Sequence, residues 1–198
     1  MEHMSDILFI RHAETDMAGT FCGHSDPELN ARGRAQLDEL TNRLRGEKID
    51  VVYSSDLRRA ETTARAIATS FAVACHVRPA LREIHFGQWE SLTWSEIEQR
   101  DRDYAQHWLA AYPNLATPEG ETFCDFERRV LEEVDSLSMM AAGCSIVVVS
   151  HGGVLRTVLR RLCGYSEADA WERTRAYGAI VRYAIPTPSA EQLIEVRS

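Results

Sequence analysis

Two histidines, each following an apolar run, are the residues of this chain best suited to chemistry on an anionic group. His12 follows Arg11 at the end of one run, and His151 precedes a glycine pair that starts at Gly152, at the end of another. Arginine presents a planar fork to phosphate oxygens, and glycine amides at a helix start add donors at the positive end of the helix dipole. A neutral histidine can attack phosphorus when its other ring nitrogen donates to a backbone carbonyl. The pattern therefore indicates binding and transfer of a phosphate dianion.

Further polar groups follow the neighbouring expected strands. Arg58 comes after the second strand, at a helix start that also holds Ser54 and Ser55, and Glu83 comes after the third strand. Ligands of open α/β sheets bind beyond the carboxyl ends of the strands, so we expect all these side chains to face one crevice. The two arginines and the second histidine would neutralise a transferring phosphoryl group without a metal ion, and Glu83 would protonate the leaving oxygen and then activate water.

Each of these residues also has a purely structural explanation. A histidine near a strand end often makes only a structural hydrogen bond, Arg58 would serve as a solvated helix residue, and Glu83 would pair with Arg82. Four further histidines stand outside any motif and are expected to be structural: His24, His76, His85 and His107. The joint placement of the chosen set favours the functional interpretation.

The elements that must position these groups alternate between strand-like and helix-like patterns, which predicts βαβ units and a mainly parallel sheet. Strands are expected at 6–11, 50–54, 74–78, 145–150, 178–186 and 191–197, the last two as an antiparallel hairpin at an edge. Helices are expected after an N-cap at Asn30, at 57–71, after a capping box at Thr122 and Asp125, and at 153–163. The predicted fold class is α/β.

The segment 88–121 interrupts this alternation and is expected to be a helical excursion from the sheet, which resembles a cap. It contains a capping box at Thr93 and Glu96 and is rich in aromatic residues, namely Trp89, Trp94, Tyr104, Trp108 and Tyr112. These rings would either bury the excursion against the body or form a lid over the crevice.

Composition limits the classes of protein that this chain can be. Its 198 residues, 44% hydrophobic and 26% charged, predict a single globular domain over 1–198. The net charge of −8 argues against nonspecific nucleic-acid binding. No apolar run is long enough to span a bilayer, and the first residues lack the pattern of a signal peptide, so a cytoplasmic protein is expected. Five scattered cysteines without a CxxC pair predict free thiols and no zinc site.

Five segments, in order along almost the whole chain, resemble the histidine phosphatase superfamily, also called the phosphoglycerate-mutase-like family. They are 11–15, 53–64, 81–90, 118–122 and 150–156. The resemblance implies a three-layer α/β/α sandwich and a metal-independent enzyme that forms a phosphohistidine and needs no cofactor. It implies that His12 is the phosphorylated nucleophile and Glu83 the proton donor, and that Arg11, Arg58 and His151 complete the phosphate pocket.

Two departures from the family pattern lie close to His12. Ala13 replaces the usual glycine, which is tolerable if its φ is negative. The following loop is shorter than usual and lacks the asparagine that often touches the phosphate. Thr20, or backbone amides near Cys22 and Gly23, would then replace that contact, and Gly152 would contribute its amide.

The resemblance favours a phosphomonoester hydrolase over a mutase. The insertion before Gly120 is shorter than in mutases, so water should reach the phosphohistidine. The segments 23–27 and 83–98 look most like the α-ribazole phosphatase branch, which acts in cobalamin synthesis, and aromatic residues of the excursion would stack on a benzimidazole.

Three alternatives stay open: a cofactor-dependent phosphoglycerate mutase, a broad-specificity sugar phosphate or phosphoserine phosphatase, and a noncatalytic binding protein. The expected partner is a small-molecule phosphomonoester, with no nucleic acid and no membrane. An edge strand at 191–197 would also allow a homodimer.

Overall fold

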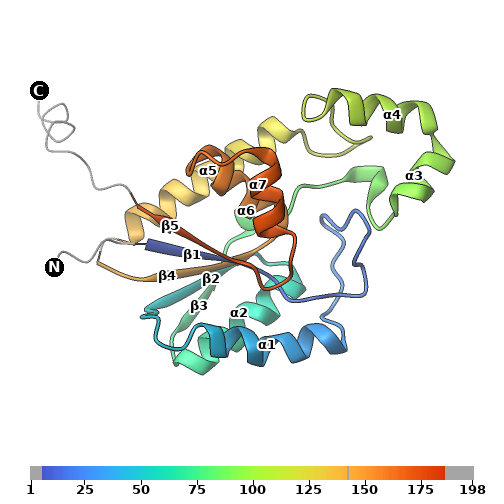
Figure 1. The fold of residues 1–198 in the computed structure, drawn as a ribbon. Coiled ribbons are helices and arrows are strands. Elements are labelled where there is room, and N and C mark those ends of the chain that lie inside the picture. Colours follow the sequence, from blue (N-terminus) through green and yellow to red (C-terminus); the bar gives the residue numbers. More distant parts are fainter. Residues whose placement is uncertain (1–5, 142, 186–198) are drawn as a thin grey trace, which may run out of the picture.

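A mixed sheet forms the centre of the computed structural model, which describes residues 6–141 and 143–185 (Figure 1). Five strands are in the order β3-β2-β4-β1-β5. Their bounds are Asp6–Arg11 (β1), Val51–Ser54 (β2), Ala74–Val77 (β3), Ile146–Ser150 (β4) and Ile180–Ala184 (β5). The first four are mutually parallel, and β5 pairs antiparallel with β1 at an edge, with Phe9 opposite Val181. The expected mainly parallel sheet with an antiparallel edge strand is confirmed.

Helices cover both faces of the sheet and make three layers (Figure 1). Alternate residues of β1 point to opposite faces, so Leu8 and Ile10 pack toward α1 (Ala31–Arg43) and α2 (Arg58–Phe71). Ile7 and Phe9 pack toward the other layer. That layer contains α5 (Phe123–Met140), α6 (Gly152–Arg161) and α7 (Glu167–Thr174). The expected three-layer α/β/α sandwich is confirmed.

Side-chain caps begin several of these helices where the sequence predicted them. The Asn30 side chain accepts from the Gly33 amide at 2.7 Å, and Thr122 accepts from the Asp125 amide at 3.0 Å. The helix α7, capped by Ser166, was not predicted. It is short and buries only Ala170 and Thr174 completely, so its apolar periodicity is weak.

The predicted hairpin at the end of the chain is only partly described. The strand expected at 178–186 is β5, but its neighbour in the sheet is β1. The strand expected at 191–197 lies outside the described residues.

The excursion, residues 88–121, contains α3 (Trp94–Arg100) and α4 (Arg102–Ala111) and lies to one side of the sheet (Figure 1). Trp89 and Trp108 are buried in its own apolar cluster, and Phe21 packs edge-on against Trp89 with ring centroids 5.5 Å apart. Phe21 also donates its amide to Leu92 at 2.9 Å. Burial of the excursion thus accounts for Trp89 and Trp108, whereas Trp94 and Tyr104 are partly buried and Tyr112 is exposed.

In the part of the chain that the structure describes, no helix is both long and apolar enough to cross a membrane.

Candidate active site

The two histidines lie side by side because β1 and β4 are adjacent parallel strands that end at the same level. Arg11 is opposite Ser150 in the register, and the His12 amide donates to the Ser150 carbonyl at 2.9 Å. The rings of His12 and His151 are 5.1 Å apart, centroid to centroid. The expected convergence at the strand ends is therefore present.

His12 is held as a neutral ring with a defined tautomer. Its Nδ1 lies 2.7 Å from the Ala13 carbonyl, to which it must donate, and its Nε2 accepts from Nε of Arg59 at 3.2 Å. Burial lowers the pKa of His12 well below its ordinary value, and the charges of Arg59 and Arg11 lower it further. Nε2 therefore carries the lone pair that a nucleophile needs.

Ala13 fits the position where the family usually has glycine. Outside glycine, the described residues with positive φ are Ala72, Ser91 and Glu119, so Ala13 has the negative φ that a side chain requires. Its amide donates to Oγ1 of Thr63 at 3.1 Å.

The arginine that reaches His12 is Arg59, and the expectation that Arg58 lines this pocket is corrected. The Arg58 side chain is 57% exposed and forms an ion pair with Glu28. Arg59 is completely buried. Besides His12, its guanidinium donates to the carbonyls of Ser25 at 2.6 Å, Gly23 at 2.7 Å and Cys22 at 3.3 Å.

Helix geometry explains why one arginine points inward and its neighbour outward. Successive helical residues are about 100° apart around the axis, so Arg58 lies off the buried stripe on which Arg59 lies. Arg59 shares the buried stripe of α2 with Thr63 and Ile67, at intervals of four residues. That apolar stripe was the signal in the sequence that could have distinguished Arg59 from Arg58.

Arg11 is anchored by the segment after α7. Its Nη1 donates to the Thr174 carbonyl at 3.1 Å and to the Arg175 carbonyl, and its guanidinium lies 4.4 Å from the Tyr177 ring centroid. Tyr177, which the sequence did not single out, is also 5.6 Å from the His12 ring. Nε of Arg11 is buried and has no hydrogen-bond partner among the described residues. Such a donor is available to a bound anion.

His151 is completely buried, with one ring nitrogen paired and the other unpaired. Nε2 lies 2.9 Å from Oγ of Ser55, whereas Nδ1 has no hydrogen-bond partner within the described ranges. Burial lowers the pKa of His151 well below its ordinary value, and the Arg59 and His12 charges act in the same direction. The second histidine is therefore neutral before an anion binds.

Glu83 lies at the N-terminus of α6, beside His151. Its Oε2 accepts from the Gly153 amide at 2.9 Å, and its Oε1 accepts from its neighbour Ile84 at 3.1 Å. A side chain at position 153 would collide with the Glu83 carboxyl, so only glycine allows this approach. We call Arg11, His12, Arg59, Glu83 and His151 the histidine cluster.

The loop donors expected to replace the missing asparagine are engaged elsewhere. The Thr20 hydroxyl donates to the Met17 carbonyl at 2.8 Å, and the Cys22 amide donates to the Thr20 carbonyl at 3.0 Å. The Gly23 amide donates to Glu90 at 3.2 Å. The loop instead contributes carbonyls that hold Arg59, because the amides of Gly23, His24 and Ser25 donate to the Glu90 carboxylate. Gly152 does lie in the site, beside the guanidinium of Arg11.

Glu90 organises this loop and was not predicted to do so. Its carboxylate accepts from the amides of Gly23, His24 and Ser25 at 2.8–3.2 Å and from the Ser25 hydroxyl at 2.6 Å. Burial opposes ionisation of Glu90, but the hydrogen bonds from Ser25, Phe86 and His24 outweigh it and lower its pKa. Glu90 therefore fixes the carbonyls that hold Arg59.

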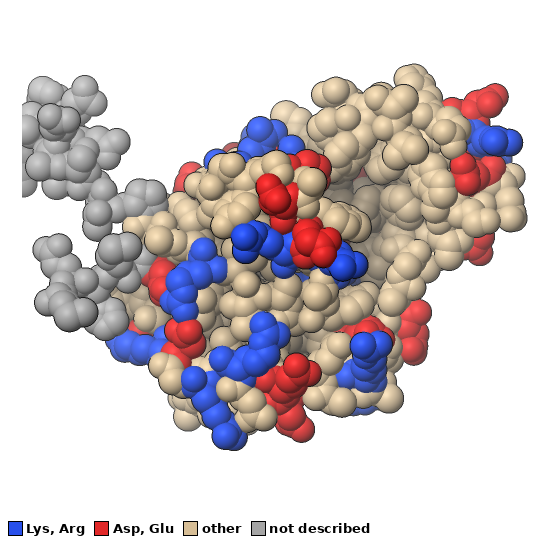
Figure 2. All heavy atoms as spheres, viewed as in Figure 1, with Lys and Arg blue, Asp and Glu red and all other residues tan. Residues whose placement is uncertain are grey.

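The histidine cluster combines a buried guanidinium group, a partly buried one, two neutral imidazoles and one carboxyl, an arrangement suited to a phosphate group. In the described residues, no group of three or more histidine, cysteine, aspartate and glutamate side chains could hold a metal ion. Figure 2 shows the surface hollowed between the excursion and the layer formed by α6 and α7.

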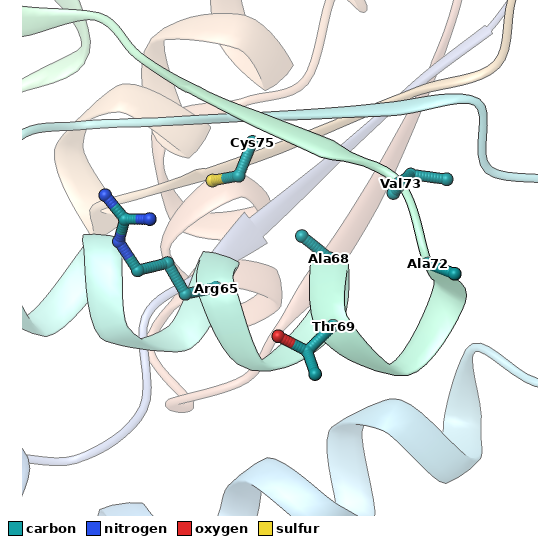
Figure 3. Close-up of a pocket in the computed structure, with 6 residues that line it drawn as sticks. All are labelled: Arg65, Ala68, Thr69, Ala72, Val73 and Cys75. Carbon is teal, nitrogen blue, oxygen red and sulfur yellow. The ribbon is translucent and has the colours of Figure 1, made fainter.

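A separate cavity of about 360 Å³ lies between α2 and β3 (Figure 3). Its lining residues are Arg65, Ala68, Thr69, Ala72, Val73 and Cys75, none of which belongs to the histidine cluster. Burial raises the pKa of the Cys75 thiol, so this cavity holds no activated nucleophile.

Comparison with known proteins agrees with this geometry. The family model for the histidine phosphatase superfamily (branch 1) matches residues 7–190. The adenosylcobalamin/alpha-ribazole phosphatase of Escherichia coli (strain K12) is 34% identical over 167 residues, which cover 83% of this chain and 82% of that protein. The metal-independent phosphoserine phosphatase of Arabidopsis thaliana is 33% identical over 170 residues, which cover 83% of this chain and 71% of that protein. The crystal structure of the alpha-ribazole phosphatase from Shigella flexneri has a TM-score of 0.80 at 31% identity, covering 89% of both chains.

Proposed function

The chain belongs to the histidine phosphatase superfamily, and from this membership we propose that it hydrolyses a small phosphomonoester through a phosphohistidine on His12. The observation that carries the proposal is the state of His12. Its Nδ1 proton is held by the Ala13 carbonyl, and its Nε2 lone pair faces Arg59 within a buried site. A neutral, oriented imidazole next to guanidinium groups is the arrangement that nucleophilic attack on a phosphate requires.

In the first step, Nε2 of His12 attacks phosphorus and the bond from phosphorus to the ester oxygen breaks. Protonated Glu83 donates its proton to the departing alkoxide, so the alcohol leaves neutral. Nε of Arg59 turns from the histidine to a phosphoryl oxygen, and Nε of Arg11 and Nδ1 of His151 bind the remaining oxygens. His151 takes up a proton from solvent as the phosphate dianion binds and returns it to solvent when inorganic phosphate leaves.

In the second step, the Glu83 carboxylate takes a proton from water, and the water oxygen attacks phosphorus. The bond between phosphorus and Nε2 breaks, which releases inorganic phosphate and restores neutral His12. The amides of Gly153 and Ile84 keep the Glu83 carboxyl in place for both proton transfers.

The substrate class is supported by relatives of two kinds, one named for alpha-ribazole phosphate and one for phosphoserine. We propose α-ribazole phosphate and phosphoserine as the two substrates to compare first. A phosphoglycerate mutase is the weaker alternative, because a short excursion should let water reach the phosphohistidine once the alcohol has left.

The test is release of inorganic phosphate from a panel of phosphomonoesters by the wild type and by His12→Ala. We expect the variant to lose activity on every substrate, and acid-labile phosphate to appear on the wild-type peptide that contains His12 during turnover. Retained phosphate release by His12→Ala would show that the nucleophile is another group.

A further inference from the structure

Arg156 lies beside the histidine cluster but has no role in the mechanism above. It follows Gly152 by four residues on α6, so both residues are on the same face of the helix. A methyl group built on Gly152 would lie 3.4 Å from Nη1 of Arg156 and 3.6 Å from Cζ of Arg11. The two guanidinium groups therefore lie against the same backbone position at the active site.

The charge of Arg156 is not compensated by a carboxylate in the part of the chain that the structure describes. Arg160 and Arg161, on the same helix, both form ion pairs with Glu127, and Arg160 also pairs with Glu167. For Arg156, no ion pair is formed by the residues at 6–141 and 143–185. Its guanidinium instead lies 4.8 Å from the ring centroid of Trp171 in α7, a contact that holds it in place and leaves its donors free for a ligand.

Arg156 is also placed between the reacting groups and the excursion. On one side, its charge acts on Arg11. Burial is the main cause that lowers the pKa of Arg11, and the Arg156 charge lowers this pKa further. On the other side, it acts on Tyr112, at the end of α4. Burial raises the pKa of Tyr112, and the Arg156 charge partly opposes that rise. The surface is hollowed between the excursion, to which Tyr112 belongs, and the layer formed by α6 and α7, to which Arg156 belongs (Figure 2).

We propose that Arg156 binds a second anionic group of the substrate, a carboxylate beyond the transferred phosphoryl group. The planar fork of arginine fits a carboxylate with two parallel hydrogen bonds. The enzyme then prefers phosphomonoesters of small carboxylic acids, such as phosphoserine, over otherwise identical esters that lack the carboxylate. The proposal rests on the proposed function, because it places the scissile phosphate at His12.

The experiment compares kcat/KM for phosphoserine and phosphoethanolamine, which differ only in the carboxylate. The wild type should prefer phosphoserine. Arg156→Gln should lower kcat/KM for phosphoserine by about 10-fold or more, mainly by raising KM. The same variant should change kcat/KM for phosphoethanolamine by less than about 3-fold. Arg156→Lys, which keeps the charge, should recover part of the loss. Arg161→Gln, on the same helix but paired with Glu127, is the matched control and should leave kcat/KM unchanged for both substrates.

Equal activity of the wild type on both esters would overturn the proposal, as would an equal loss on both esters in Arg156→Gln. Thermal unfolding of each variant detects a loss of activity that comes from misfolding. If Arg156→Gln misfolds, the activity of Arg156→Lys on the two esters tests the proposal instead. These results differ from failure of the proposed function, in which the wild type forms no phosphohistidine with any ester.

Discussion

Nε of Arg59 lies 3.2 Å from Nε2 of His12, so a buried guanidinium donates to the lone pair that the proposed reaction uses. This contact keeps the imidazole neutral and aimed, because a proton on Nε2 would face the arginine charge. It also places a cation where negative charge shifts when phosphorus is attacked.

The adjacent arginines of α2 should differ sharply in their effect on activity. Arg59→Gln should lower kcat/KM by about 10²–10³-fold, because it removes a charged donor at the reacting atoms. Arg58→Gln should change it by less than about 3-fold, because Arg58 is exposed and its ion pair is with the exposed Glu28. Steady-state phosphate release from an aryl phosphate measures both. Similar losses in the two variants would contradict the assignment.

The stability of the protein should fall as the pH drops below about 6.5, because His12 and His151 have folded-state pKa values well below their ordinary value. In that range the unfolded chain binds protons that the folded protein does not, so the free energy of unfolding decreases as the pH falls. Each histidine contributes a slope of up to about 1.4 kcal/mol per pH unit. Urea unfolding at several pH values measures the slope.

The matched variants for this slope are His12→Asn and His151→Asn, each of which should reduce it. His107→Asn, at an exposed position of α4, should leave it unchanged. A slope that is the same in all three variants would show that the two buried histidines do not cause it.

Glu90→Gln should impair catalysis through the position of Arg59, without touching the substrate. The amide group cannot accept all the hydrogen bonds from Gly23, His24 and Ser25, so the carbonyls that hold Arg59 should shift. A displaced Arg59 lowers the pKa of His12 less, so the acid limb of kcat/KM should move to higher pH as kcat falls. A purely structural role would lower the melting temperature and leave that limb in place.

The control for Glu90 is Glu96→Gln, which alters the capping box at Thr93 on the excursion. It should change stability only slightly, because glutamine can still accept from the Thr93 amide, and it should leave the pH profile unchanged. A shift of the acid limb of kcat/KM in this variant would mean that the limb responds to any destabilising change in the protein, and would contradict the role of Glu90.

Chelation of metal ions should not reduce activity, because Arg11, Arg59 and His151 supply the positive charge that a phosphoryl group needs. Phosphate release is measured after incubation with EDTA and dialysis. Activity that is lost and then restored by a divalent cation would place a metal ion in the reaction.

Local signals in the sequence were sufficient for much of the fold. The apolar runs at 7–10 and 146–149 became adjacent buried strands, and the side chains of Asn30 and Thr122 cap helices as expected. These features depend on residues close together in the chain, so composition and spacing reveal them. The short helix α7 has a cap at Ser166 but only weak apolar periodicity, and it was missed.

The sequence by itself determined the α/β architecture and the meeting of His12, His151, Arg11 and Glu83, because residues that follow parallel strands are brought to one edge of the sheet. Only the tertiary structure decided which of two adjacent arginines reaches His12, because that depends on the rotation of α2 against the sheet. It also decided how Arg11 is held, by carbonyls and the Tyr177 ring more than 160 residues away. Contacts between distant segments have no local pattern, and packing alone creates them.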